Sequence, residues 1–259
     1  MEGDKSLEKI LEQLNIGTIL DFQRIKGGRD SIVYKVRNMS EKRYAVRILP
    51  LERVDQFKQE EHLINIAHKN GIPVPFVHQV TKVEKYAVMV MDWGRGRTVL
   101  EELLEYPENA IELGMDFGRM QHRLHDVMPS EMGKSEWLYP KSEREKKLYE
   151  KARSVNETKI CFLHMDYHPL NVLAENSKIT GVLDWMNASS GDYRYDLART
   201  YSILSAEEAR QYLGIEHALV KRFREAWLDG YYSNSKGREK FDLYIHWAND
   251  RLVREMTVD

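Results

Sequence analysis

Three side chains with oxygen donors follow one another in the stretch HMDYHPLN and the apolar run after it: Asp166, Asn171 and Asp184. Short apolar segments lie on both sides of the turn-forming sequence ENSK, which predicts a hairpin. In such a hairpin Asn171 enters the first strand and Asp184 leaves the second, so both lie at its open end. Pro169 helps to fix the preceding loop and to bring Asp166 to the same end. These oxygens suit Mg²⁺, which binds through one or two carboxylates together with substrate phosphates.

Each of these side chains alone is more often a turn residue, a helix cap or a strand-end carboxylate. Together with the hairpin, they favour a site for a metal-bound phosphate. A zinc site formed by His164 and His168 is the weaker alternative. Their spacing of four needs a helix, and Pro169 argues against one.

The elements that must position this loop fall into a strand-rich first third and a helix-rich remainder. Glycine pairs and polar turns separate the strand-like segments. These segments are residues 18–25, 31–36, 43–49, 76–83 and 86–91. The apolar spacing predicts an amphipathic helix over residues 7–14 and another over 57–67, which the sequence GIPVP ends.

The pattern changes after Met91, where the short charged sequence DWGRGR suits a connection between two lobes. Amphipathic helices are predicted over residues 98–106 and 109–127 and within 216–256. We therefore expect an α+β fold with two lobes, residues 1–92 rich in strands and residues 93–259 mostly helical.

The stretch HMDYHPLN and the hairpin after it resemble the aminoglycoside phosphotransferase family, whose members are relatives of choline kinases within the protein-kinase-like fold. The family writes this region as H-G-D-x-H-x-x-N, followed by a strand and D-W or D-x. The matching residues here are His164, Asp166, His168, Asn171, Asp184 and Trp185. Met165 stands where glycine is usual. The resemblance covers residues 17–205 and implies a five-stranded antiparallel nucleotide-binding lobe and a helical lobe with the catalytic loop and acceptor site.

The resemblance also implies a role for each residue of the loop. Asp166 would orient the acceptor hydroxyl and take its proton, while Asn171 and Asp184 would hold Mg²⁺. Asp196, in the stretch GDYRYDLART, would brace the loop through hydrogen bonds to its backbone.

Arg47 lies in the apolar segment RYAVRIL, where a cation is costly unless it is paired. In kinase-type enzymes this strand carries a cation that contacts the nucleotide phosphates and pairs with a helix glutamate. The expected partner is Glu60, which shares the apolar stripe of its helix, and Glu61 is the alternative. An arginine that simply reaches solvent is the competing interpretation.

Further nucleotide contacts are expected from the same resemblance. The turn at Gly27 and Gly28 would cover the phosphates, because glycine lets backbone N–H groups approach phosphate oxygens closely. The residues expected at the base are Ile48 and Met91 in its pocket, the carbonyl of Asp92 and the N–H of Gly94.

The amino-acid composition is that of an ordinary globular protein and gives no sign of a nucleic-acid-binding or membrane-spanning one. The 259-residue chain is 42% hydrophobic and 31% charged, with a formal net charge of −2, so no charge argument favours nucleic acid or a membrane surface. Its single cysteine excludes an internal disulfide and favours a reducing compartment. No apolar stretch approaches the length of a membrane span. We expect a cytoplasmic protein.

These features predict a small-molecule kinase that transfers the γ-phosphoryl group of ATP or GTP to a hydroxyl of an aminoglycoside-like antibiotic. The alternatives are a metabolite kinase acting on choline, a sugar or a similar alcohol, and a nucleotide-binding pseudokinase. A pseudokinase would be expected to lack one of the three oxygen ligands, and none is missing. A polycationic acceptor needs an acidic pocket. The acidic residues available in the C-terminal helices are Glu225, Asp229, Asp242, Asp250 and Glu255.

Overall fold

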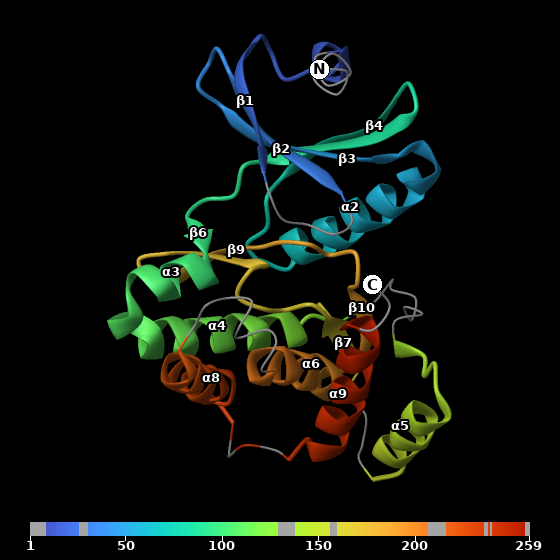
Figure 1. Ribbon diagram of the computed structural model, residues 1–259, viewed down its shortest axis with the longest axis vertical. Helices are drawn as coiled ribbons and strands as arrows, with labels where there is room; N and C mark the ends of the chain where they lie inside the picture. The colour runs from blue at the N-terminus through green and yellow to red at the C-terminus, as the bar shows by residue number, and fades with distance from the viewer. Residues whose placement is uncertain are drawn as a thin grey trace. The chain divides into compact units, whose positions relative to one another are not determined.

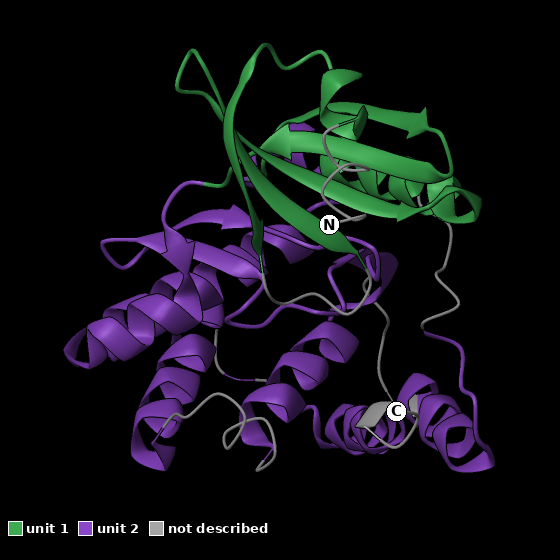
Figure 2. Ribbon diagram, turned by 45° about the horizontal axis from the view of Figure 1, so that its top comes forward, with its two compact units in different colours: residues 1–66, 74–94 green, residues 67–73, 95–259 purple. Residues whose placement is uncertain are grey.

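The computed structural model describes residues 9–25, 31–128, 138–155, 160–206, 216–235, 238 and 240–256. The chain divides into two compact units (Figure 2), residues 1–66 with 74–94 and residues 67–73 with 95–259. The first contains a five-stranded antiparallel sheet and the second is mostly helical, which confirms the predicted α+β, two-lobe plan. The functional division at residues 92 and 93 stays a prediction.

The sheet of the first unit is built from five strands (Figure 1) in the order β1-β2-β3-β5-β4, all antiparallel. The strands are β1 (Ile19–Ile25), β2 (Ile32–Asn38), β3 (Arg43–Pro50), β4 (Val77–Val83) and β5 (Tyr86–Asp92). Each coincides with one of the five predicted segments. Valine, isoleucine and tyrosine are frequent in them, and these residues pack well on a pleated surface.

One face of this sheet is covered by the chain near the N-terminus. Residues 9–12 are helical, and Ile10, Leu11 and Leu14 are buried against strand residues such as Val46 and Val88. The helix predicted over residues 7–14 is therefore confirmed over residues 9–12, while Gln13 and Leu14 are not helical and Leu7 lies outside the described residues.

Helix α2 (Val54–Lys69) follows the short 3₁₀ turn η1 (Leu51–Arg53). It buries the predicted stripe, including Phe57 and Ile64. The helix ends because Gly71 adopts a φ of +74°. The N–H groups of Gly71 and Ile72 then donate to the carbonyls of His68 and Ala67, which is a Schellman termination.

The described part of the second unit contains two small sheets. Strand β8 (Val172–Glu175) lies between β6 (Arg97–Thr98) and β9 (Lys178–Val182), and β7 (Ile160–Leu163) pairs with β10 (Ser189–Asp192). The β8–β9 hairpin is the one predicted from the sequence. Its two-residue loop, Asn176 and Ser177, has positive φ at both positions (52° and 59°), as a type I′ turn requires.

The helices described in the second unit are α3 (Val99–Glu105), α4 (Ala110–His125), α5 (Glu143–Val155), α6 (Tyr193–Ser205), α8 (His217–Tyr231) and α9 (Asp242–Met256), with the 3₁₀ turn η2 (Pro107–Asn109). Helix α3 begins with a capping box, in which Thr98 and Glu101 each accept a backbone N–H of the other. None of the described helices is long and apolar enough to cross a membrane.

Helices α4 and α8 lie side by side (Figure 1). They pack closely because glycines line their contact. A Cβ atom on Gly114 would lie 2.7 Å from the carbonyl oxygen of Phe223. A Cβ on Gly118 would overlap the backbone of Trp227, and one on Gly230 would overlap that of Met115. This close approach fixes α4, and the buried face of α4 supports the loop with the sequence HMDYHPLN.

Candidate functional site

The loop with the sequence HMDYHPLN joins β7 to β8 and lies at the open end of the β8–β9 hairpin. The N–H of Leu183, just after β9, donates to the carbonyl of Asn171 at 2.8 Å. Asn171 and Leu183 therefore face each other across the hairpin, and Asp184 is the next residue of the chain. Asp184 adopts a φ of +60°, a conformation that aspartate tolerates better than most residues.

Asn171 connects the hairpin to Asp166. Its Nδ2 donates to both the backbone carbonyl and Oδ2 of Asp166, each at 3.1 Å. The amide group is thus oriented with its nitrogen toward Asp166, which leaves its Oδ1 as the side-chain atom able to bind a cation. The sequence placed these two residues at the same end of the hairpin, and the structure brings them into contact.

His164 links the start of the loop to the same hairpin. Its Nε2 lies 2.9 Å from the carbonyl of Leu183, so Nε2 carries the proton, and Nδ1 accepts the N–H of Asp166 at 3.3 Å. Burial lowers the pKa of His164, which keeps this ring neutral. With both nitrogens engaged inside the protein, His164 does not serve as a zinc ligand. No cluster of three or more His, Cys, Asp and Glu suited to a metal occurs among the described residues.

The carboxylate of Asp166 is held in its ionised form. Burial raises its pKa, but the interaction with His168 and the charge of Arg199 outweigh burial and lower it to about 2. His168 Nε2 lies 3.6 Å from Asp166 Oδ2, and 22% of the Asp166 side chain is exposed. Asp166 is therefore a charged, partly accessible acceptor of hydrogen bonds across the neutral pH range.

Asp196, on α6, braces the loop as the resemblance implied. Its Oδ1 accepts the N–H of Met165 at 2.6 Å, and its Oδ2 accepts the N–H of His164 at 3.3 Å. Asp196 is fully buried, and His125 Nε2 lies 2.9 Å from its Oδ2. Burial raises the pKa of Asp196, but the hydrogen bond and charge of His125 outweigh it and lower the pKa overall.

The groups that hold Asp196 come from α4 and α8 and were not predicted. His125, which contacts Asp196, lies with its Nδ1 2.8 Å from the hydroxyl of Tyr231. Gln121 Nε2 donates to Asp196 Oδ2 at 3.4 Å and to Thr200 Oγ1 at 3.0 Å. The sequence does carry a signal for them. Gln121 and His125 are four residues apart on a helix face that is otherwise apolar, and a polar residue on a buried face needs partners.

Met165 occupies the position where the family usually has glycine, and its backbone explains that preference. Its φ is +65°, a left-handed conformation that costs about 1–2 kcal/mol for a residue other than glycine. The Met165 side chain is completely buried. Burial and the bond to Asp196 offset the strain.

In the first unit, Arg47 pairs with Glu60, as predicted, and not with Glu61. Arg47 Nη1 lies 2.5 Å from Glu60 Oε1, and Glu60 is fully buried. The guanidinium also lies 5.4 Å from the centre of the Phe57 ring. The solvent-facing interpretation is therefore wrong, because only 9% of Arg47 is exposed.

The two residues predicted to line one base pocket lie on opposite faces of the sheet. Met91 pairs with Ala45, two residues before Arg47, so it shares the face of Arg47. Ile48 points the other way and is buried in the cluster formed with Ile10 and neighbouring residues of the N-terminal segment. The placement of Ile48 beside Met91 was wrong, since successive strand residues alternate between faces.

Two backbone hydrogen bonds fix the last residue of β5 and the residue after it. The N–H of Asp92 donates to the carbonyl of Phe76 at 2.9 Å, and the N–H of Trp93 donates to that of Arg43 at 3.0 Å. Base recognition by Asp92 and Gly94 stays a prediction. Gly27 and Gly28 lie outside the described residues.

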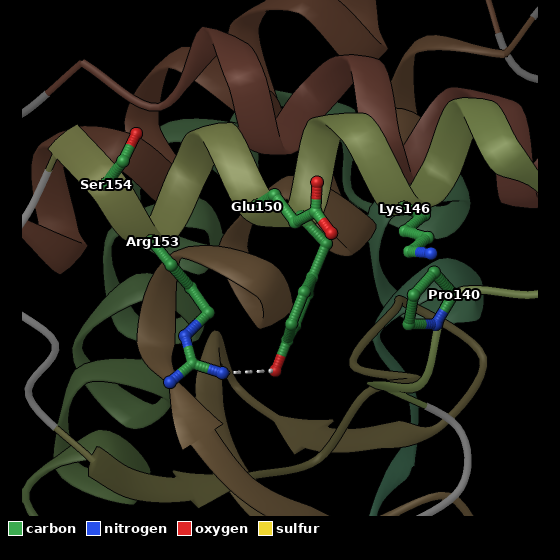
Figure 3. Close-up of a pocket in the computed structure, with 6 residues that line it drawn as sticks. Pro140, Lys146, Glu150, Arg153 and Ser154 are labelled. Atoms are coloured by element: carbon green, nitrogen blue, oxygen red, sulfur yellow. Dashed lines mark hydrogen bonds between the residues drawn. The ribbon is translucent and has the colours of Figure 1, made fainter.

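A cavity of about 580 Å³ lies along α5 (Figure 3) and is lined by Pro140, Lys146, Tyr149, Glu150, Arg153 and Ser154. Arg153 donates to the hydroxyl of Tyr149 at 3.4 Å. None of the residues assigned above to the candidate site is among these six. Two of the acidic side chains considered for a polycationic acceptor are already paired, Asp229 with Arg238 at 2.5 Å and Asp250 with Arg144 at 2.7 Å.

The fold resembles those of several antibiotic-modifying enzymes of known structure. An aminoglycoside-3′-phosphotransferase of type VIII is 18% identical, with 95% of this chain and 97% of that chain covered and a TM-score of 0.65. An amicoumacin kinase bound to AMP-PNP and Ca²⁺ is 15% identical over 99% and 89% of the two chains, with a TM-score of 0.69. A macrolide 2′-phosphotransferase from Brachybacterium faecium is 17% identical over 97% and 89%, with a TM-score of 0.61.

No curated protein matches the sequence. The model of the phosphotransferase enzyme family matches residues 21–158 and 139–242, which together span most of the chain. Because this match covers more than half of the chain, the chain belongs to the phosphotransferase enzyme family.

Proposed function

We propose that this protein is a small-molecule kinase that transfers the γ-phosphoryl group of ATP or GTP to a hydroxyl of an antibiotic in the cytoplasm. The observation that carries the proposal is the pair of hydrogen bonds from Asn171 Nδ2 to Asp166. These bonds hold the charged carboxylate of Asp166 beside the amide of Asn171, whose oxygen is then able to bind a cation. Both residues lie at the open end of the β8–β9 hairpin, and Asp184 follows the second strand of that hairpin. Phosphoryl transfer needs such positioning more than it needs covalent chemistry from the protein.

The donor set fits a magnesium ion that is also bound by phosphates. Asn171 and Asp184 would supply two hard oxygen ligands, and Mg²⁺ usually takes only one or two protein carboxylates, with the remaining ligands from substrate phosphates and water. When bound, the ion would neutralise negative charge on the phosphates.

Asp166 would act on the acceptor. Its carboxylate would accept a hydrogen bond from the acceptor hydroxyl and aim the oxygen at the γ-phosphorus. A bond forms between that oxygen and phosphorus, the bond to the bridging oxygen breaks, and the nucleoside diphosphate leaves. The hydroxyl proton passes to Asp166 and then to water. A pKa near 2 makes Asp166 a weak base, so its main contribution would be orientation.

The first unit would bind the nucleotide. Arg47, held by Glu60, would contact the phosphates, and its fixed guanidinium suits their oxygens. Met91, the carbonyl of Asp92 and the N–H of Gly94 would contact the base, while Gly27 and Gly28 would cover the phosphates.

The acceptor class is supported by the relatives of similar fold, whose names include aminoglycoside, macrolide and amicoumacin kinases. The ion pairs of Asp229 and Asp250 favour a second candidate, a metabolite kinase for a less cationic alcohol. Paired carboxylates offer less attraction to a polycation such as an aminoglycoside.

The test begins with binding of ATP and GTP, measured by calorimetry with and without Mg²⁺. Transfer from [γ-³²P]ATP and GTP is then screened over aminoglycosides, macrolides, amicoumacin, choline and sugars. Phosphorylation of an antibiotic, lost in Asp166→Asn, is the expected result. Transfer to choline or a sugar alone would favour the second candidate. If Mg²⁺ left nucleotide binding unchanged, the proposal would be wrong.

A further inference from the structure

A β-bulge lies at the start of β4, beside the end of β5. The two strands are antiparallel, with Val77 opposite Met91 and Gln79 opposite Val90. His78 is thus the extra residue of β4. Bulges bend a strand and redirect a side chain, and they are frequent next to active sites.

The bulge directs His78 onto Asp92. His78 Nε2 lies 2.7 Å from Asp92 Oδ1. Two rings pack edge-on against the imidazole, with centroid distances of 5.0 Å for Phe76 and 5.3 Å for Tyr44. The His78 side chain is 28% exposed and that of Asp92 is 48% exposed, so the rings, more than burial, fix the imidazole.

Two backbone bonds complete the hold on Asp92. Its own N–H donates to the carbonyl of Phe76 at 2.9 Å, and the N–H of Trp93 donates to the carbonyl of Arg43 at 3.0 Å. The carbonyl of Asp92 belongs to the same planar peptide group as the N–H of Trp93. The orientation of this peptide group is therefore fixed by the hydrogen bond to Arg43 on β3. The contacts of Asp92 with His78 and Phe76 hold it from the other side.

We infer that His78 is a positioning residue for the nucleotide, which acts by fixing Asp92 and so the carbonyl that is to receive the base. This inference rests on the proposed nucleotide-binding role of Asp92. A preorganised acceptor binds the base without the loss of freedom that a mobile segment would suffer on binding. The bulge, the imidazole of His78 and the rings of Phe76 and Tyr44 together supply this rigidity.

The central test compares His78→Phe, which keeps a ring and loses the hydrogen bond, with His78→Gln, which restores a donor. One hydrogen bond contributes about 0.5–1.5 kcal/mol, so His78→Phe should raise the nucleotide Kd and KM about 3- to 10-fold. The kcat should change less than twofold, because no group at the phosphates is altered. His78→Gln should recover part of the affinity. Tyr86→Phe, at the other end of β5, serves as the matched control and should bind as the parent does.

A double-mutant cycle shows whether His78 acts through Asp92. Asp92→Ala should weaken binding as His78→Phe does, and the double variant should be no weaker than either single variant. Additive losses would overturn the inference, as would a parental Kd in His78→Phe. In those cases the parent still binds Mg²⁺-nucleotide, so the proposed function stands. If the parent bound no nucleotide, both would fall.

Discussion

The carboxylate of Asp196 accepts the backbone N–H of Met165 at 2.6 Å, so a fully buried residue of α6 fixes the position just before Asp166. The same carboxylate accepts the N–H of His164. Two consecutive peptide groups are thereby tied to one side chain. The placement of Asp166 depends on this tie, because the loop between β7 and β8 contains no regular secondary structure of its own.

Asp196→Asn should separate this bracing role from chemistry. The amide keeps one acceptor oxygen and loses the charge that His125 faces at 2.9 Å. We expect a loss of about 1–3 kcal/mol in the free energy of unfolding, measured by urea denaturation. The kcat should fall while the nucleotide Kd stays near that of the parent. Asp196→Asn with parental kcat and parental stability would contradict the bracing role.

The geometry of the loop HMDYHPLN could be predicted because it depends on residues that are close together in the sequence. Asp166, Asn171 and Asp184 are placed by one hairpin and by a turn with a clear composition, and the hairpin has the predicted form. The pair of Arg47 and Glu60 was predictable for a similar reason. A cation in an apolar strand and an anion in an apolar helix stripe each need a partner.

The remaining features depend on contacts between distant segments. The strand β10 has the sequence SSGD, which lacks the alternation that marks a strand, and pairing with β7 alone defines it. The strain at Met165 cannot be read from its residue type. The wrong placement of Ile48 could have been avoided from the sequence alone, because the alternation of side chains along a strand places Ile48 on the face opposite to Arg47.

Arg47→Ala should weaken nucleotide binding and reduce stability, because it leaves the buried carboxylate of Glu60 without its partner. Breaking a buried ion pair costs about 3–5 kcal/mol. Arg47→Lys should be milder, since it keeps the charge and loses the planar fork. Stability is measured by urea denaturation and nucleotide Kd by calorimetry. The variant Arg47→Ala with Glu60→Gln tests the phosphate contact, because its stability should recover while its affinity stays low. If affinity recovered as well, Arg47 would have no contact with phosphate.

Gly118→Ala should destabilise the protein although alanine is the better helix former. Replacing a helical glycine usually gains about 1 kcal/mol, but here the added methyl group meets the backbone of Trp227. Overpacking of this kind costs about 1–3 kcal/mol and forces α4 and α8 apart. Thermal unfolding measures the effect. Ile111→Ala is the control on the same helix, because Ile111 is 60% exposed and its loss should be nearly neutral. A Tm of Gly118→Ala at or above the parental value would show that the helices are not in close contact.

The depressed pKa of Asp166 predicts how stability depends on pH. Its folded pKa of about 2 lies below the ordinary value of 3.8, so the ionised form stabilises the fold by about 2 kcal/mol. This contribution is complete above about pH 4 and is lost as the pH falls toward 2. Urea denaturation of the parent and of Asp166→Asn between pH 2 and 6 isolates it. The difference between their unfolding free energies should change across that window and stay constant above it. A difference that changed only above pH 5 would show that the pKa is not depressed.

The last prediction separates the two aspartates at the catalytic loop. Asp184→Ala should lose Mg²⁺-dependent nucleotide binding and transfer together, because Asp184 is proposed as a metal ligand. Asp166→Ala should bind Mg²⁺-nucleotide nearly as the parent does, while its turnover falls by about 10²- to 10⁴-fold. Asp166→Asn belongs in the same series, because it retains an oxygen that can accept the hydrogen bond of Asn171. Asp55→Ala is the control, since its side chain is 87% exposed in the other unit.

Circular dichroism must first show that each variant is folded, and calorimetry and single-turnover transfer are then measured on the same preparations. Asp166→Asn matters most here. Should Asp166→Ala unfold the loop, the asparagine variant still tests the chemistry with Asn171 held in place. If Asp166→Asn turned over like the parent, the carboxylate would have no catalytic role. If Asp184→Ala kept its Mg²⁺-dependent binding, the metal would have to be held by other residues.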